Sequence, residues 1–140
     1  MSDMIDISKI KVEFGGDNPP KDQRFIDLFE DAIVGKLLVR LVLVKIEGIR
    51  PFSDFRPEIS DGYRKYFEEL EGKGTPPPLY VYPDKDHFIM SDDYNAYFLY
   101  KEKKYTEIMC ILLGDSDSEY IIEKSEPFPL PPPQIAITEK

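Results

Sequence analysis

The feature that most constrains this fold is a double change in the spacing of apolar residues between Leu79 and Leu113. Apolar and polar residues alternate on both sides of a turn at 83–86, which is typical of two half-buried strands. From Ser91 onward, aromatic residues recur at three- and four-residue steps, as on one face of a helix. A continuous apolar run then closes the segment. The pattern predicts strand, strand, helix and strand, with the helix starting within two residues of Asp92.

Four further elements are predicted before this segment. Alternation over 5–14 predicts a strand that ends at a turn of glycines and prolines, 15–20. Residues 22–34 have the apolar spacing of an amphipathic helix. The run 37–46 is too short and too charged to cross a membrane, and it predicts a strand near the middle of a sheet. A short second helix is expected to begin near Ser60.

The composition indicates one domain followed by a tail. With 140 residues, of which 41% are hydrophobic, the chain can bury a core without disulfides or a structural metal. We expect a single domain over 1–125, closed by a short edge strand at 120–122, and a proline-rich tail over 126–140. The predicted class is α/β (α+β), with a small mixed sheet and about three helices.

Charge and rare residue types exclude several functions. The 18 basic and 27 acidic residues give a net charge of −9, which argues against binding to a nucleic-acid backbone. Cys110 is the only cysteine and His87 the only histidine, so neither an intramolecular disulfide nor a His/Cys zinc site can form. We expect no metal and no cofactor. The first residues have neither a basic region nor a long apolar stretch, which favours a cytoplasmic protein that does not enter membranes.

The element order over 74–114 resembles that of the ParB and sulfiredoxin-like superfamily. The residues that carry the resemblance are Pro-Pro-Leu-Tyr-Val-Tyr at 77–82 and Phe-Ile-Met-Ser-Asp at 88–92, and the similar region spans roughly 22–114. The resemblance implies a small mixed sheet as the core. It also implies a hairpin that leads into a helix through an Asp-Gly-x-x-Arg type motif, which binds phosphate or nucleotide.

Only the first residue of that motif is kept here. The resemblance places the acidic residue at Asp92, the glycine at Asp93, a cysteine or histidine at Tyr94, the next polar residue at Asn95 and the arginine at Ala96. A carboxylate in place of the glycine repels an anion at the helix end whose dipole would otherwise attract one. The sequence therefore predicts that the phosphate site is lost.

Two interpretations of this turn remain. Ser91, Asp92 and Asp93 are residue types that cap helices, so their role can be structural alone. Alternatively, the same residues together with Asn95 form a site for a cation or another polar ligand.

Aromatic residues supply the second candidate surface. Eight of the nine tyrosines lie between Tyr63 and Tyr105, and tyrosine is common both at core margins and at protein interfaces. Five prolines in the seven residues 127–133 favour an extended segment. We expect this segment to lie back on its own domain, or on a second copy, and to cover part of an aromatic face. The predicted interaction residues are Tyr63, Tyr66, Tyr80, Tyr82, Phe128 and Leu130.

Three other candidates are interpreted as structural. Cys110 lies in an apolar strand, where a thiol is usually a small hydrophobic group. His87 is expected to be an exposed residue at the edge of a turn. The stretch from Asp115 mimics the opening of a calcium loop, but Tyr120 stands where that loop needs a glycine, so affinity should be poor.

The sequence thus favours a non-catalytic binding module with no catalytic residues, whose partner is another protein or a second copy of the chain. One alternative is a nucleotide-binding or phosphoryl-transfer enzyme of the same superfamily that uses Asp92. Another is a DNA-binding protein like the partition proteins, against which the net charge argues.

Overall fold

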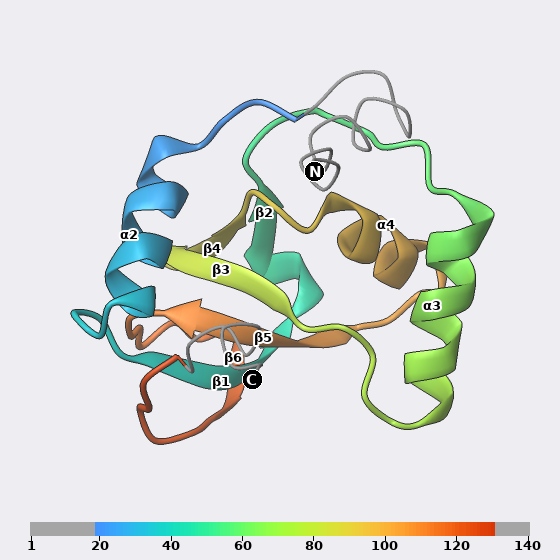
Figure 1. Ribbon diagram of the computed structural model, residues 1–140. Helices are drawn as coiled ribbons and strands as arrows, with labels where there is room; N and C mark the ends of the chain where they lie inside the picture. Colours follow the sequence, from blue (N-terminus) through green and yellow to red (C-terminus); the bar gives the residue numbers. More distant parts are fainter. Residues whose placement is uncertain (1–18, 131–140) are drawn as a thin grey trace, which may run out of the picture.

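The computed structural model describes residues 19–130 and shows a six-stranded mixed sheet with helices on both faces (Figure 1). In chain order the elements are α2 (Gln23–Ile33), β1 (Val39–Lys45), the 3-10 turn η2 (Ile46–Gly48), β2 (Ile49–Pro51), α3 (Asp61–Gly72), β3 (Leu79–Asp84), β4 (His87–Met90), α4 (Tyr94–Glu102), β5 (Glu107–Leu113) and β6 (Ile121–Lys124). The predicted α/β class and small mixed sheet are therefore confirmed, and the helices of residues 19–130 match the expected number of about three. The predicted strand at 5–14 lies outside the described residues.

The strand order is β2-β4-β3-β5-β1-β6. β3 and β4 form the predicted antiparallel hairpin, in which Tyr82 faces Ile89. β3 also pairs in parallel with β5, placing Leu79 opposite Cys110. β1 lies between β5 and β6 and is antiparallel to both, so it is an interior strand, and β6 is the edge strand expected near 120–122.

α4 supplies the crossover that parallel pairing of β3 and β5 requires. The helix begins at Tyr94, two residues after Asp92, as predicted. α2 begins and ends within one residue of the predicted range 22–34, and α3 begins one residue after Ser60. The Asp22 carboxylate accepts a hydrogen bond from the backbone N–H of Arg24 at 3.1 Å, and Gly35 follows the end of α2 with a φ of +83°. The Ser60 hydroxyl caps α3.

The short strand β2 was not predicted. The apolar run 37–46 ends before these residues, yet Ile49–Pro51 pairs in parallel with β4 at the other edge of the sheet. Three residues that end in a proline carry no alternation to recognise, and their partner strand lies far along the chain.

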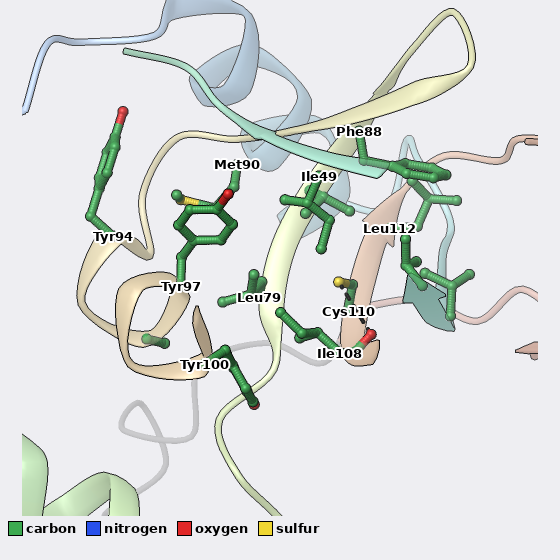
Figure 2. Close-up of a cluster of buried hydrophobic side chains, with 14 of the residues drawn as sticks. Ile49, Leu79, Phe88, Met90, Tyr94, Tyr97, Tyr100, Ile108, Cys110 and Leu112 are labelled. Carbon is green, nitrogen blue, oxygen red and sulfur yellow. Dashed lines mark hydrogen bonds between the residues drawn. The ribbon is translucent and has the colours of Figure 1, made fainter. Parts of the chain in front are cut away.

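The sheet divides the core into two clusters. Side chains alternate between the faces of a strand, so Leu79 and Val81 of β3 point toward α3 and α4, while Tyr80 and Tyr82 point toward α2. Figure 2 shows the larger cluster, in which Leu79 lies with residues of α4 and β5. We call these the α4-side cluster and the α2-side cluster.

Gly48 of η2 packs closely against the Tyr120 side chain. A Cβ at this position would lie 2.5 Å from Cγ and 2.6 Å from Cβ of Tyr120, which packs against the α4-side cluster. We expect Gly48→Ala to lower the free energy of unfolding by about 1–3 kcal/mol, measured by urea denaturation, because the ring must move.

Gly62→Ala is the matched control. Its added Cβ would meet only the Ser60 hydroxyl, at 3.9 Å, within α3. Alanine has the higher helix propensity, so stability should be unchanged or raised by up to about 1 kcal/mol. Equal effects of the two substitutions would contradict the steric explanation.

Candidate functional site

The predicted turn lies between the end of β4 and the first turn of α4. Ser91 is 5% exposed, and among residues 19–130 its hydroxyl has no hydrogen-bond partner. Asp92 is exposed, and Asn95 is partly buried in the first turn of the helix. The four predicted residues are thus adjacent, but they face different surroundings.

Asp93 does not make the capping hydrogen bond that its position favours. It is the N-cap residue of α4, yet its side chain accepts no hydrogen bond from the first turn. Instead its Oδ2 accepts one from the backbone N–H of Tyr80 at 2.9 Å. The prediction that Asp93 caps the helix through its side chain is therefore wrong. The carboxylate instead accepts a hydrogen bond from a backbone amide of β3.

The strand pairing explains this exchange. β4 pairs with β3 only from Tyr82 to Asp84, while β5 pairs with the part of β3 that contains Tyr80. An amide left beyond the end of β4 needs an acceptor, because an unpaired buried N–H is costly. Asp93 provides that acceptor, and so joins the start of α4 to β3.

Burial raises the pKa of Asp93 to about 6. The hydrogen bond from Tyr80 opposes this rise, and the neighbouring charge of Asp92 adds to it. At neutral pH the carboxyl is therefore mostly ionised in a poorly solvated position. A negative charge at this turn disfavours phosphate, which would otherwise be attracted to a helix N-terminus.

Two other positions matched to the phosphate-binding motif are occupied by core residues. Ala96 is 2% exposed and Tyr94 is 3% exposed. The Tyr94 hydroxyl lies 2.9 Å from that of Ser53, and its ring packs edge-on against Phe55 at 5.2 Å between centroids. Tyr94 thus fastens α4 to the segment between β2 and α3.

The four predicted tyrosines do not form one surface. Tyr63 and Tyr66 lie on α3, with ring centroids 5.5 Å apart, and Tyr66 is 51% exposed. Tyr80 and Tyr82 belong to the α2-side cluster, across the sheet. The expected single aromatic face is therefore wrong, because α3 packs on the face of the sheet opposite to these two side chains.

Phe128 and Leu130 pack against the α2-side cluster, so this part of the proline-rich segment lies back on its own domain. Phe128 exchanges two backbone hydrogen bonds with Val39, both at 2.9 Å. In the same cluster, the Tyr82 hydroxyl donates to Asp22 at 2.7 Å. Residues 131–140 of the predicted tail lie outside the described residues.

Cys110 and His87 have structural surroundings. Cys110 is fully buried, and burial raises the pKa of its thiol well above the ordinary value. An Nη2 of Arg50 lies 3.1 Å from His87 Nε2 and donates to it, since arginine only donates. The His87 ring also packs against Tyr120.

A lysine occupies the place of a cation in the calcium-like loop. Lys124 Nζ donates to Asp115 Oδ1 and to the Ser116 carbonyl, each at 2.9 Å, and lies 3.7 Å from Asp117 Oδ1. Within the part of the chain that the structure describes, no group of three or more metal-binding side chains occurs.

One part of the α2-facing side of the sheet carries exposed apolar side chains. Leu43 and Met109 face each other across β1 and β5, and Leu41 follows along β1. Leu41 is 40% exposed and Met109 39%. Leu43 is partly buried. On β6, Ile122 is 40% exposed and is the extra residue between the pairs Leu43–Glu123 and Val44–Ile121, so it lies beside Leu43. We call Leu41, Leu43, Met109 and Ile122 the sheet patch.

A groove beside α4 was also missed by the sequence analysis. It lies between residues 51–59 and α4, and Arg56, Phe98 and Lys101 line both of its pockets. Lys101 lies in the last turn of α4, where basic residues are favoured by the helix dipole, so its residue type alone does not indicate a groove. The irregular segment that contains Arg56 has no periodicity from which its fold could be predicted.

No protein-family model matches this chain, and a search of curated proteins finds no significant relative. None of the helices formed by residues 19–130 is both long enough and apolar enough to cross a membrane.

The raised pKa of Asp93 predicts a pH dependence of stability. Because the folded pKa of about 6 exceeds the usual 3.8, the folded state binds more protons between these values. The Asp93 contribution to stability should therefore be most favourable below about pH 4 and fall by about 3 kcal/mol as the pH rises through 6. Asp93→Asn keeps an oxygen acceptor for Tyr80 without the charge, so it should raise stability at pH 7 and leave it unchanged at pH 4.

Denaturation curves of the wild type and the variant across this pH range measure the difference. Subtracting the free energy of unfolding of the variant from that of the wild type at each pH removes the contributions of the other carboxylates. Gly62→Ala, which changes no titratable group, is the control, and its difference from the wild type should not vary with pH. A wild type that becomes more stable than Asp93→Asn as the pH rises from 4 to 6 would contradict the assignment.

Proposed function

We propose that this chain is a non-catalytic binding domain that contacts another protein surface through the sheet patch. The observation that carries the proposal is the group of apolar side chains left exposed on three adjacent strands, β5, β1 and β6. Isolated exposed apolar residues are common, whereas contiguous ones are typical of interaction sites.

Two further features support the patch as a contact surface. Leu41, Leu43 and Met109 project from paired interior strands, so their positions are fixed before any partner binds. The side chains of leucine and methionine are apolar, so covering them leaves no polar group without a hydrogen bond. Because the side chains are already positioned, covering the patch costs little conformational entropy.

We infer that the partner is a second copy of the chain. A twofold contact uses the same patch on both copies and is the commonest arrangement of soluble oligomers. Each patch residue would then act twice in the interface, which adds to its effect on affinity.

We also propose that the domain is a divergent member of the ParB and sulfiredoxin-like superfamily. The hairpin β3–β4 followed by α4 and the parallel strand β5 supports this origin. The inward position of the Asp93 carboxylate supports a role that does not depend on phosphate at the start of α4.

Charged substitutions in the sheet patch test self-association. We expect the sedimentation coefficient of the wild type to rise with protein concentration. Leu41→Lys and Met109→Lys should each weaken association by about tenfold or more, because each places two charges in a twofold contact. Circular dichroism checks that both variants fold.

Tyr66→Lys is the matched control. Tyr66 is exposed to a similar degree, but it lies on α3, across the sheet from the patch. The Tyr66→Lys variant should associate like the wild type. A wild type that stays monomeric at all concentrations, or a loss of association in Tyr66→Lys alone, would contradict the proposed surface.

Nucleotides provide a separate test against the enzyme alternative. A ligand present at a hundred times its dissociation constant stabilises the folded state by about 2.7 kcal/mol. We expect ATP and ADP with magnesium to leave the melting temperature of the full chain unchanged. An increase that Asp92→Asn abolishes would favour a nucleotide-binding enzyme instead.

A further inference from the structure

The groove beside α4 contains two cations that are held on aromatic rings. The guanidinium carbon of Arg56 lies 4.7 Å from the centroid of the Phe98 ring, and Lys101 Nζ lies 5.7 Å from that of Tyr97. Both distances are in the range of cation–π attraction. Contact with a ring face positions a cation but leaves its charge unneutralised, so each cation can still bind an anion.

Neither cation forms an ion pair within residues 19–130. The salt bridges of this part of the chain involve other basic residues, including Arg64, whose guanidinium binds both carboxylate oxygens of Glu102 at 2.6 and 3.2 Å. Most basic side chains of residues 19–130 lie outside these ion pairs, and what distinguishes Arg56 and Lys101 is that they line the same groove. They are also neighbours, because Phe98 and Lys101 lie on one side of α4.

The cavity has the size of a small-molecule site. A pocket of about 580 Å³ lies on the side of Glu58 and Ile59, and one of about 390 Å³ lies on the side of Ser53 and Asp54. Sites for small molecules usually enclose about 300–1,000 Å³. Because Arg56, Phe98 and Lys101 line both pockets, a ligand in either one would meet both cations.

The attraction for an anion is local to Arg56 and Lys101, which line both pockets. Over the whole groove three acidic side chains, Asp54, Glu58 and Glu102, balance the three basic ones, Arg56, Arg64 and Lys101. Since Glu102 is paired with Arg64, the acidic groups that remain beside the two free cations are Asp54 and Glu58. These carboxylates would repel a ligand with several negative charges, which favours a single anionic group.

The apolar lining determines the rest of the ligand. Phe98 is partly buried and borders both pockets, and Pro57 and Ile59 line the larger one. A flat ring can pack against such surfaces, and aromatic rings favour offset or edge-on contacts. The segment that carries Arg56 is held in place by the contact between the Ser53 and Tyr94 hydroxyls, at 2.9 Å.

We propose that this groove binds a small molecule in which one phosphate or carboxylate group is attached to a flat ring. The oxyanion bridges Arg56 and Lys101, and the ring packs against Phe98. This site is separate from the sheet patch, which lies on the other side of the sheet, so it can be tested independently of self-association.

Three probes separate the parts of this ligand in NMR titrations of the full chain. Phenyl phosphate and benzoate carry the two oxyanions on a ring, while inorganic phosphate lacks the ring. We expect the first two to shift the backbone amides of residues 53–56 and 97–101. Inorganic phosphate should shift the same amides more weakly, because it loses the packing on Phe98. The better of the two ring compounds identifies the oxyanion.

Arg56→Gln and Lys101→Gln test the cations. Each substitution should weaken binding of the better probe by about tenfold, since hydrogen bonds to charged groups contribute about 1.5–3 kcal/mol. Both side chains are exposed, so the variants should keep the wild-type spectrum elsewhere. Lys65→Gln, an exposed residue of α3, is the control and should bind like the wild type.

Several results would overturn the proposal. One is the absence of localised shifts with both ring compounds. Another is a set of shifts centred on residues 91–95, which would place the anion at the start of α4. A third is equal weakening in all three variants, because that pattern indicates a general effect of charge instead of a site.

Discussion

The hydrogen bond from the Tyr80 amide to the Asp93 carboxylate, 2.9 Å long, joins the sheet to the helix that crosses over it. β4 stops pairing with β3 before Tyr80, and without Asp93 this amide would lack an acceptor on that side. The Asp93 carboxylate thus accepts the hydrogen bond that a backbone carbonyl of β4 would accept if that strand were longer. Because α4 must begin where this bond forms, the bond also fixes where Tyr94 and Tyr97 enter the core.

The same bond separates this turn from the phosphate sites that helix N-termini often provide. Such a site needs free N–H groups and space for the anion. Here a poorly solvated carboxylate lies at the turn, and its pKa of about 6 records the cost of that position. The Asp93 carboxylate therefore connects α4 to β3 and does not contribute to ligand binding. The exposed surfaces beyond α4's first turn then become the better candidates for binding.

Local patterns were sufficient to predict most elements of the fold. The period change at Ser91 placed the start of α4, the apolar spacing over 22–34 placed α2, and the residue type at Ser60 placed the start of α3. These signals are local, since capping and alternation depend on neighbours in sequence. β2 was missed because its three residues acquire strand geometry only by pairing with β4.

The candidate site was less predictable, because it depends on which face each element covers. Alternation shows that Tyr80 and Tyr82 share one face of β3, but not that α2 packs there while α3 packs on the other. Tyrosines that are close in sequence were therefore separated by the sheet. Likewise, the sequence indicates that Asp93 is a helix cap. Its hydrogen bond to the Tyr80 amide follows only from the position of β3 in the fold.

The groove shows a related limit. Arg56 lies in an irregular segment, and its position depends on Phe98, 42 residues later, whose ring lies beneath its guanidinium. No spacing rule connects two such residues. The net charge argued against binding to a nucleic-acid backbone, but it describes the average surface and gives no information on a local pair of cations.

The two proposed surfaces should respond to salt in opposite directions. Two copies that each carry nine net negative charges repel one another, so salt that screens this repulsion favours contact through the apolar sheet patch. Attraction between an oxyanion and the cations Arg56 and Lys101 is itself screened, so salt weakens that contact. Both effects arise within about 10 Å of the surface at ordinary ionic strength. Raising the salt concentration should therefore strengthen self-association and weaken binding of the oxyanion, as two independent effects on surfaces that lie on opposite sides of the sheet.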